Sequence, residues 1–174
     1  TRRFGRLWLL PDPSDDVPAG LAALGPEPLD PGFNADLLAG RLAGRCRSSL
    51  KAALLDQSVI AGLGNIYADE ALYAGGLYPA RPAGSLSGEE TARLAEAIRT
   101  VLNDAIACNG TSIRDYVDGW NQQGRFQNCL QVYGRAGQAC RRCGQTIKSI
   151  RLAGRTTCWC PACQPEKTGF PSRS

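Results

Sequence analysis

Four cysteines near the end of the chain form two Cys-x2-Cys pairs, Cys140 with Cys143 and Cys160 with Cys163, separated by sixteen residues. Thiolates at this spacing suit tetrahedral zinc, because each pair closes a tight turn and the intervening residues are long enough for a hairpin. The alternative, disulfides or unligated thiols, is disfavoured because adjacent Cys-x2-Cys pairs form strained disulfides. The sequence therefore predicts one structural Zn²⁺ ion. With no open coordination position, such an ion would perform no Lewis-acid chemistry.

The segment between the cysteine pairs, residues 145–159, carries the basic side chains Lys148, Arg151 and Arg155. A hairpin this small buries little apolar surface, so the metal would stiffen it. We expect the hairpin to present its basic residues to an anionic partner.

Arginine dominates the positive charge of the chain. Seventeen of the 20 basic residues are arginine, the formal net charge is +4, and there is no histidine. The planar guanidinium suits phosphates and base edges, so the composition permits nucleic-acid binding, although a merely solvated surface is the alternative. The absence of histidine excludes a histidine base, a histidine metal ligand and a Ser-His-Asp triad.

The length of 174 residues and the 43% hydrophobic content predict one ordinary core and a small satellite domain. The apolar runs are too short for a membrane span, and the N-terminus lacks the apolar segment of a secretory signal. The cysteines outside the two pairs show no disulfide spacing, which favours a reducing cytoplasm. We expect a cytoplasmic, monomeric protein with no membrane partner.

Capping signals and apolar spacing predict four helices, at residues 35–43, 48–55, 65–74 and 88–107. Asn34 is the predicted N-cap of the first helix, and Ser87 with Glu90 forms a capping box for the last. The remaining predicted segments are a strand at 4–10, a proline-rich linker at 11–32, a polar ligand-contacting loop at 111–127, a short strand at 131–134 and a disordered tail at 165–174.

A glycine-containing turn precedes the third predicted helix. Gly62 and Gly64 would let a phosphate approach the backbone, and a helix beginning near Asn65 would direct free N–H groups and its positive dipole end outward. Such turns are more often plain connections, but a basic segment upstream, with Arg45 and Arg47, favours an anion site.

The run Leu54-Leu-Asp-Gln-Ser-Val-Ile-Ala-Gly-Leu-Gly-Asn-Ile-Tyr-Ala-Asp-Glu70, followed by a ribbon that closes on Cys-Pro-Ala-Cys-Gln164, resembles bacterial formamidopyrimidine-DNA glycosylases. The resemblance implies a mainly α fold with a small β part. A helix-two-turn-helix domain (33–130, with residues 111–127 capping the lesion) would precede a zinc finger (131–164). Residues 1–32 would be the end of an N-terminal β-sandwich domain and a linker.

The same resemblance implies base-excision repair of damaged double-stranded DNA. The family removes oxidised purines, such as 8-oxoguanine and formamidopyrimidines, and cleaves the abasic site by β,δ-elimination. Endonuclease VIII, which acts on oxidised pyrimidines, shares the architecture, but Asp69-Glu70 after Asn-Ile-Tyr-Ala is closer to the purine branch. Two further functions compatible with these motifs are a non-catalytic DNA-binding module and a zinc ribbon for protein contacts.

Family roles fall on matching positions. Arg2 and Phe4 resemble the wedge that fills the space of a flipped-out base, although Phe4 could be ordinary strand core. Asn65 resembles the asparagine that grips phosphate. Arg155 resembles the finger arginine that contacts the phosphate at the lesion and assists the δ-elimination. Ser112 matches the loop over the flipped base.

Four further residues complete the predicted interface. Tyr133 resembles a tyrosine near the lesion pocket, and Arg45, Arg47 and Lys51 are expected to contact DNA. Cys46 departs from the family, which usually has a basic residue at this position.

The family attacks the sugar with an N-terminal proline beside a glutamate, and this chain opens on Thr-Arg-Arg-Phe without a methionine. We therefore expect a preceding catalytic domain, and little glycosylase or lyase activity from these residues alone.

Overall fold

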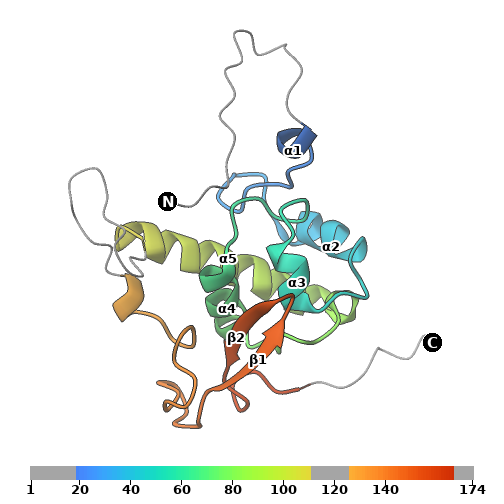
Figure 1. The fold of residues 1–174 in the computed structure, drawn as a ribbon. Coiled ribbons are helices and arrows are strands. Elements are labelled where there is room, and N and C mark those ends of the chain that lie inside the picture. Colours follow the sequence, from blue (N-terminus) through green and yellow to red (C-terminus); the bar gives the residue numbers. More distant parts are fainter. Residues whose placement is uncertain (1–18, 111–125, 167–174) are drawn as a thin grey trace.

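Side-chain caps define where the helices of the protein begin. The computed structural model describes residues 19–110 and 126–166 (Figure 1). Asn34 accepts the backbone N–H of Leu37 at the start of α2, and Ser87 and Glu90 form both bonds of the capping box of α5, so both predicted caps are confirmed. Helices α2 (Ala35–Ala43), α4 (Asn65–Ala74) and α5 (Gly88–Ala107) have the predicted bounds.

Two helices differ from the sequence prediction. Helix α3 spans Leu50–Leu55 and begins two residues later than expected, because Ser49 acts as its N-cap and accepts the N–H of Ala52. A short helix, α1 (Ala19–Ala22), lies inside the predicted linker. Short 3-10 turns at Ala83–Ser85 and Phe126–Asn128 complete the helical elements.

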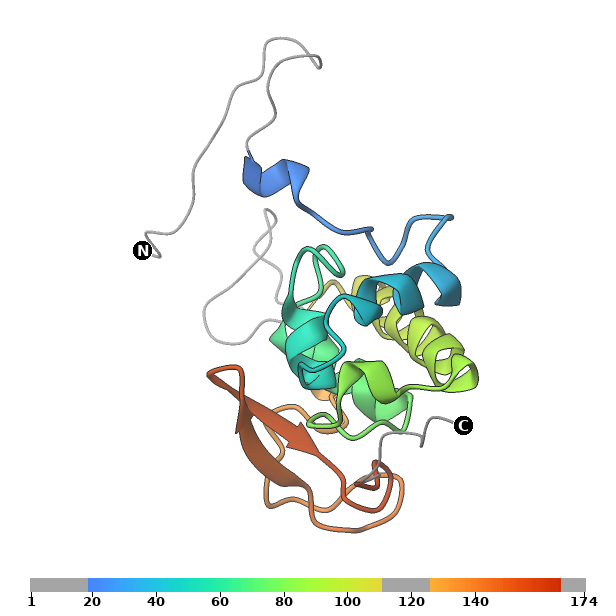
Figure 2. The same cartoon turned by 90° about the vertical axis from the view of Figure 1, so that its right-hand side faces the viewer.

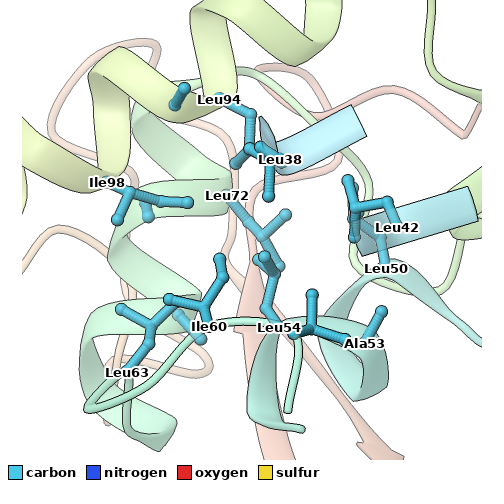
Figure 3. Close-up of a cluster of buried hydrophobic side chains, with 14 of the residues drawn as sticks. Leu38, Leu42, Leu50, Ala53, Leu54, Ile60, Leu63, Leu72, Leu94 and Ile98 are labelled. Carbon is cyan, nitrogen blue, oxygen red and sulfur yellow. The ribbon is translucent and has the colours of Figure 1, made fainter. Parts of the chain in front are cut away.

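Leucine and isoleucine side chains from four helices form the main core, which α4 shares with α2, α3 and α5 (Figure 3). Leu38, Leu54, Leu72, Leu94 and Ile98 are fully buried. The spacing of these residues at three or four positions along each helix gives each helix one apolar stripe. The core therefore fixes the helix that begins at the glycine-containing turn.

The zinc-finger region contains one antiparallel hairpin of β1 (Lys148–Leu152) and β2 (Arg155–Trp159), with Lys148 opposite Trp159 and Leu152 opposite Arg155. Ala153 and Gly154 have φ values of 47° and 72°, as a tight two-residue hairpin turn requires. The hairpin lies beside the helical domain and not within its core (Figure 2). This hairpin turn places Arg155 at the exposed end of the finger.

The predicted short strand at 131–134 is wrong. The backbone N–H groups of Gln131, Val132 and Tyr133 bind the carboxylate of Glu70, so they do not pair with another strand. The predicted strand at 4–10, most of the loop at 111–127 and most of the tail lie outside the described residues. No helix among the described residues is long and apolar enough to cross a membrane.

Candidate nucleic-acid interface and metal centre

The four predicted zinc ligands converge. The sulfur atoms of Cys140, Cys143, Cys160 and Cys163 all lie within 4.8 Å of one another, with 3.9 Å between Cys140 and Cys163 and 3.4 Å between Cys143 and Cys160. Tetrahedral zinc with Zn–S bonds of about 2.3 Å separates its sulfurs by about 3.8 Å. The four thiols therefore fit a zinc ion. Cys158 is buried and is not part of this cluster.

Helix α4 reaches the metal centre through Tyr73. The tyrosine hydroxyl lies 3.2 Å from the sulfur of Cys140, and the guanidinium of Arg142 lies 4.6 Å from the centre of the Tyr73 ring. Burial raises the pKa of Tyr73, and the hydrogen bond to Cys140 adds to the increase. A thiolate has no proton to donate, so a metal-bound Cys140 would accept a hydrogen bond from the Tyr73 hydroxyl.

The turn before α4 is open on its outer side. Gly62 has a φ of 77°, and a Cβ added at Gly62 or Gly64 would meet no atom within 4 Å. Gly64 is the N-cap of α4, and no side chain caps this end of the helix. Gln57 braces the turn by accepting the N–H of Gly62 and donating to the carbonyl of Leu63. The uncapped N–H groups are suited to a phosphate oxygen.

Asn65 is the first residue of α4 and is half-buried. Its backbone carbonyl accepts a hydrogen bond of 2.7 Å from the ammonium of Lys51. Its side-chain Oδ1 is buried and has no hydrogen-bond partner in the part of the chain that the structure describes. The buried Lys51 side chain therefore fixes the backbone of Asn65 from the protein interior.

Arg155 is exposed at the first position of β2, three residues before Cys158. Burial lowers the pKa of Lys51, and the charge of the Arg155 guanidinium lowers it further, while Asp69 opposes both effects. Lys51 binds the Asn65 carbonyl and Asp69, and Asp69 accepts the N–H of Cys158 on the strand that begins at Arg155, so hydrogen bonds link the turn to β2. The structure thus brings Asn65 and Arg155 into the same region.

The prediction that Lys51 contacts DNA directly is wrong. Its side chain is fully buried and forms a 2.6 Å ion pair with Asp69, whose side chain is also fully buried. A phosphate cannot reach the ammonium in this arrangement. Lys51 instead holds the Asn65 carbonyl and the Asp69 carboxylate inside the protein.

The upstream basic residues are exposed, as an interface requires. Arg45 forms a 2.7 Å ion pair with Asp56 and a weaker hydrogen bond to Ser58, so part of its guanidinium is engaged within the protein. Arg47 and Cys46 are also exposed. A DNA contact by Arg45 or Arg47 remains a prediction.

Of the predicted lesion-pocket residues, Tyr133 is half-buried and packs against the cluster of Val101, Ala105, Phe126 and Leu130. Arg2, Phe4 and Ser112 lie outside the described residues.

Sequence reasoning missed three residues of α4 that hold the finger. Asp69 accepts the N–H of Cys158 at 3.1 Å, Glu70 accepts three backbone N–H groups from residues 131–133, and Tyr73 contacts Cys140. The only sequence signal was the presence of two adjacent acidic residues inside an apolar helix.

Two segments of the chain match known protein families. Residues 24–117 match the formamidopyrimidine-DNA glycosylase H2TH domain, and residues 137–165 match the zinc finger found in FPG and IleRS. The first match covers more than half of the chain and includes the turn at Gly62–Gly64. The second match includes the four clustered cysteines. The chain belongs to the formamidopyrimidine-DNA glycosylase family, so the resemblance and the fold class predicted from the sequence are confirmed.

Individual proteins similar to this chain belong to the same family. The chain is 54% identical over 164 residues to the formamidopyrimidine-DNA glycosylase of Desulfitobacterium hafniense, covering 94% of this chain and 60% of that protein. It is 57% identical over 151 residues to that of Moorella thermoacetica, covering 87% of this chain and 55% of that protein. The chain thus spans 60% or less of the length of these curated relatives.

Solved structures share the fold. The MutM (FPG) protein of Thermus thermophilus superimposes with a TM-score of 0.79 and 45% identity, over 84% of this chain and 56% of that chain. The Lactococcus lactis Fpg in complex with an abasic site containing DNA gives a TM-score of 0.76 and 39% identity, over 83% of this chain and 52% of that chain.

Proposed function

We propose that this chain binds damaged double-stranded DNA as part of a base-excision repair enzyme for oxidised purines. The observation that carries the proposal is the chain of hydrogen bonds from Asn65 through Lys51 and Asp69 to Cys158, which joins the open turn to the strand that begins at Arg155. The open turn at Gly62–Gly64 binds one backbone phosphate through N–H groups, and Arg155 binds a second. Two phosphate contacts from separate elements fix the orientation of a duplex without specifying its sequence.

In the intact protein, the proposed activity is bifunctional. The damaged purine is removed, and the abasic site is cleaved by β,δ-elimination with Arg155 holding the phosphate at the lesion. Arg45 and Arg47 supply further backbone contacts, Arg2 and Phe4 fill the space of the flipped base, and Ser112 and Tyr133 contact it. An endonuclease VIII-like preference for oxidised pyrimidines is the alternative substrate class.

We propose that Cys140, Cys143, Cys160 and Cys163 hold one structural zinc ion. Zinc supplies no chemistry to the reaction, because all four positions are occupied by protein sulfur; it stiffens the finger that carries Arg155. The protein acts as a cytoplasmic monomer on bacterial DNA.

The experiment measures the dissociation constant for a duplex with one abasic site, using the protein and its Arg155→Ala variant. We expect Arg155→Ala to weaken binding at least tenfold, in line with the loss of one charge-assisted phosphate contact, and the far-UV circular dichroism to stay unchanged. Arg93→Ala, which removes an exposed arginine of α5, is the matched control and should leave affinity within about twofold. Equal affinity of the protein and Arg155→Ala would overturn the proposed role.

A further inference from the structure

We propose that Lys51 and Asp69 form a buried ionic brace that sets the separation between the phosphate-binding turn and Arg155. Both are positioning residues for DNA binding, and neither touches DNA. This inference rests on the proposed function, since it concerns the geometry of the same interface.

The brace joins three elements through two side chains. The ammonium of Lys51, on α3, lies 2.6 Å from Asp69 Oδ1 and 2.7 Å from the carbonyl oxygen of Asn65. The second oxygen of Asp69 accepts the backbone N–H of Cys158, on β2, at 3.1 Å. Helix α3, the first turn of α4 and strand β2 of the finger hairpin therefore meet at one ion pair.

Stability alone does not account for a pair of this kind. Both side chains are 0% exposed, and removing two charges from water costs about as much as their attraction returns, so apolar residues of similar volume often serve equally well. An apolar pair, however, has no donor for the Asn65 carbonyl and no acceptor for the Cys158 N–H. Those two backbone contacts are what the charged pair provides.

The contacted backbone atoms belong to the two proposed phosphate-binding elements. Lys51 binds the carbonyl of Asn65 itself, at the first residue of α4. Cys158 follows Arg155 by three residues on the same strand, a distance of about 10 Å along an extended chain. Without the brace, the hairpin and the turn would no longer be fixed to one another at this point. A change of about 1 Å in their separation would disturb simultaneous contact with two phosphates.

The hydrogen bonds of Glu70 and Tyr73 do not replace the brace. They attach residues 131–133 and Cys140 to α4. These residues precede β1 in the chain, whereas Arg155 lies on β2. The hydrogen bond from the Cys158 N–H to Asp69 joins α4 to β2, beside the apolar cluster that contains Tyr73 and Cys158.

The test compares duplex affinity in a double-mutant cycle. The variant Lys51→Met/Asp69→Leu replaces the ion pair by apolar side chains of similar size. We expect it to fold, to keep its zinc, and to bind an abasic-site duplex about tenfold more weakly, a coupling typical of residues in one network. In an Arg155→Ala background, the same pair of substitutions should change affinity by less than about twofold, because the brace acts through Arg155. A purely structural role would give equal losses in both backgrounds.

Asp69→Asn is the second variant, in case the apolar pair does not fold. The amide keeps the shape of the side chain but leaves Lys51 without its counter-charge, and we expect a loss of duplex affinity of the same sign. Unchanged affinity of a folded, zinc-loaded Asp69→Asn protein would overturn the brace. If the unsubstituted protein itself does not bind the abasic-site duplex, the proposed function fails instead, so the two failures are distinguishable.

Discussion

The helical domain and the zinc finger are stabilised in opposite ways. The helical core consists of fully buried leucine and isoleucine side chains from four helices. The finger has a much smaller apolar cluster, in which three of the six buried residues are cysteines, Cys140, Cys158 and Cys160. Apolar burial accounts for the first region, whereas in the second a cluster of four thiols that fits a metal ion and polar contacts to α4 take a larger share.

Helix α4 belongs to both regions. Ala68, Ala71 and Leu72 face the helical core, whereas Asp69, Glu70 and Tyr73 bind the finger. Both sets follow the three-to-four-residue period of one helix. The core therefore fixes α4, and the polar side chains on the other face of α4 then fix the finger.

Loss of the metal should produce the largest effect and should separate the two regions. Structural zinc contributes about 10–16 kcal/mol to the folding of small zinc domains. We expect chelation, or Cys160→Ala, to expose the backbone of residues 147–160 to hydrogen exchange while α5 stays protected. Cys129→Ala, which removes an exposed cysteine outside the cluster, is the control. Simultaneous unfolding of both regions would contradict their separate stabilisation.

Leu72→Ala should weaken the helical core and not the metal centre of the finger. Leu72 is fully buried, and truncation of such a side chain costs about 2–5 kcal/mol through lost burial and the cavity left behind. Urea unfolding followed by far-UV circular dichroism measures this change. Leu24→Ala, at a leucine that is 40% exposed, should cost much less. A loss below about 1 kcal/mol for Leu72→Ala would contradict the account of the core.

Tyr73→Phe tests the contact between α4 and the metal centre. The substitution removes the hydroxyl that lies 3.2 Å from Cys140 and keeps the ring. Loss of a hydrogen bond to a metal ligand typically lowers metal affinity about 10–100-fold, which competition with a chromophoric chelator would measure. Tyr78→Phe is the control, because the hydroxyl of Tyr78 interacts with Glu166. Equal zinc affinity of Tyr73→Phe and the unsubstituted protein would show that the hydroxyl does not support the site.

The smallest effect is expected at an exposed polar contact. Hydrogen bonds from Ser58, followed by that from Arg45, lower the pKa of Asp56 to about 2. A lowered pKa stabilises the fold at pH values above the unfolded value of about 3.9, and the contribution disappears as the pH falls through about 2. Because the Arg45 and Asp56 side chains are 48% and 31% exposed, the contribution should stay below about 1 kcal/mol.

Asp56→Asn should therefore be slightly less stable than the unsubstituted protein at pH 6, and the difference should vanish near pH 2. Thermal unfolding at the two pH values measures it. A difference that persists at pH 2 would mean that the charge of Asp56 is not its cause.

The sequence predicts local features well because their causes are local. Asn34 and the Ser87 and Glu90 pair identify helix starts through contacts that span three residues, and Cys-x2-Cys spacing predicts a metal centre whose sulfurs do converge. The resemblance adds what spacing cannot, namely the expectation that the turn and Arg155 belong to one interface.

The failures concern contacts between distant residues. Lys51 is predicted to contact DNA, but it forms a fully buried ion pair with Asp69, which is 18 residues away. Residues 131–134 were expected to form a strand, but their N–H groups bind Glu70, more than 60 residues away. Two adjacent acidic residues inside an apolar helix indicate that the carboxylates are unusual, but the sequence does not identify their partners, because a buried charge is explained only by the groups that surround it in three dimensions.

The most direct test of the account is the salt dependence of affinity for an abasic-site duplex, measured for the zinc-loaded and the zinc-stripped protein. Each phosphate contact contributes about 0.9 to the slope of log affinity against log salt concentration. We predict that removal of zinc weakens binding and reduces the slope by about one such contact, that of Arg155, while the helical circular dichroism persists. Equal affinity and slope in the two forms, with the helices intact, would contradict the claim that the docked finger is part of the DNA-binding surface.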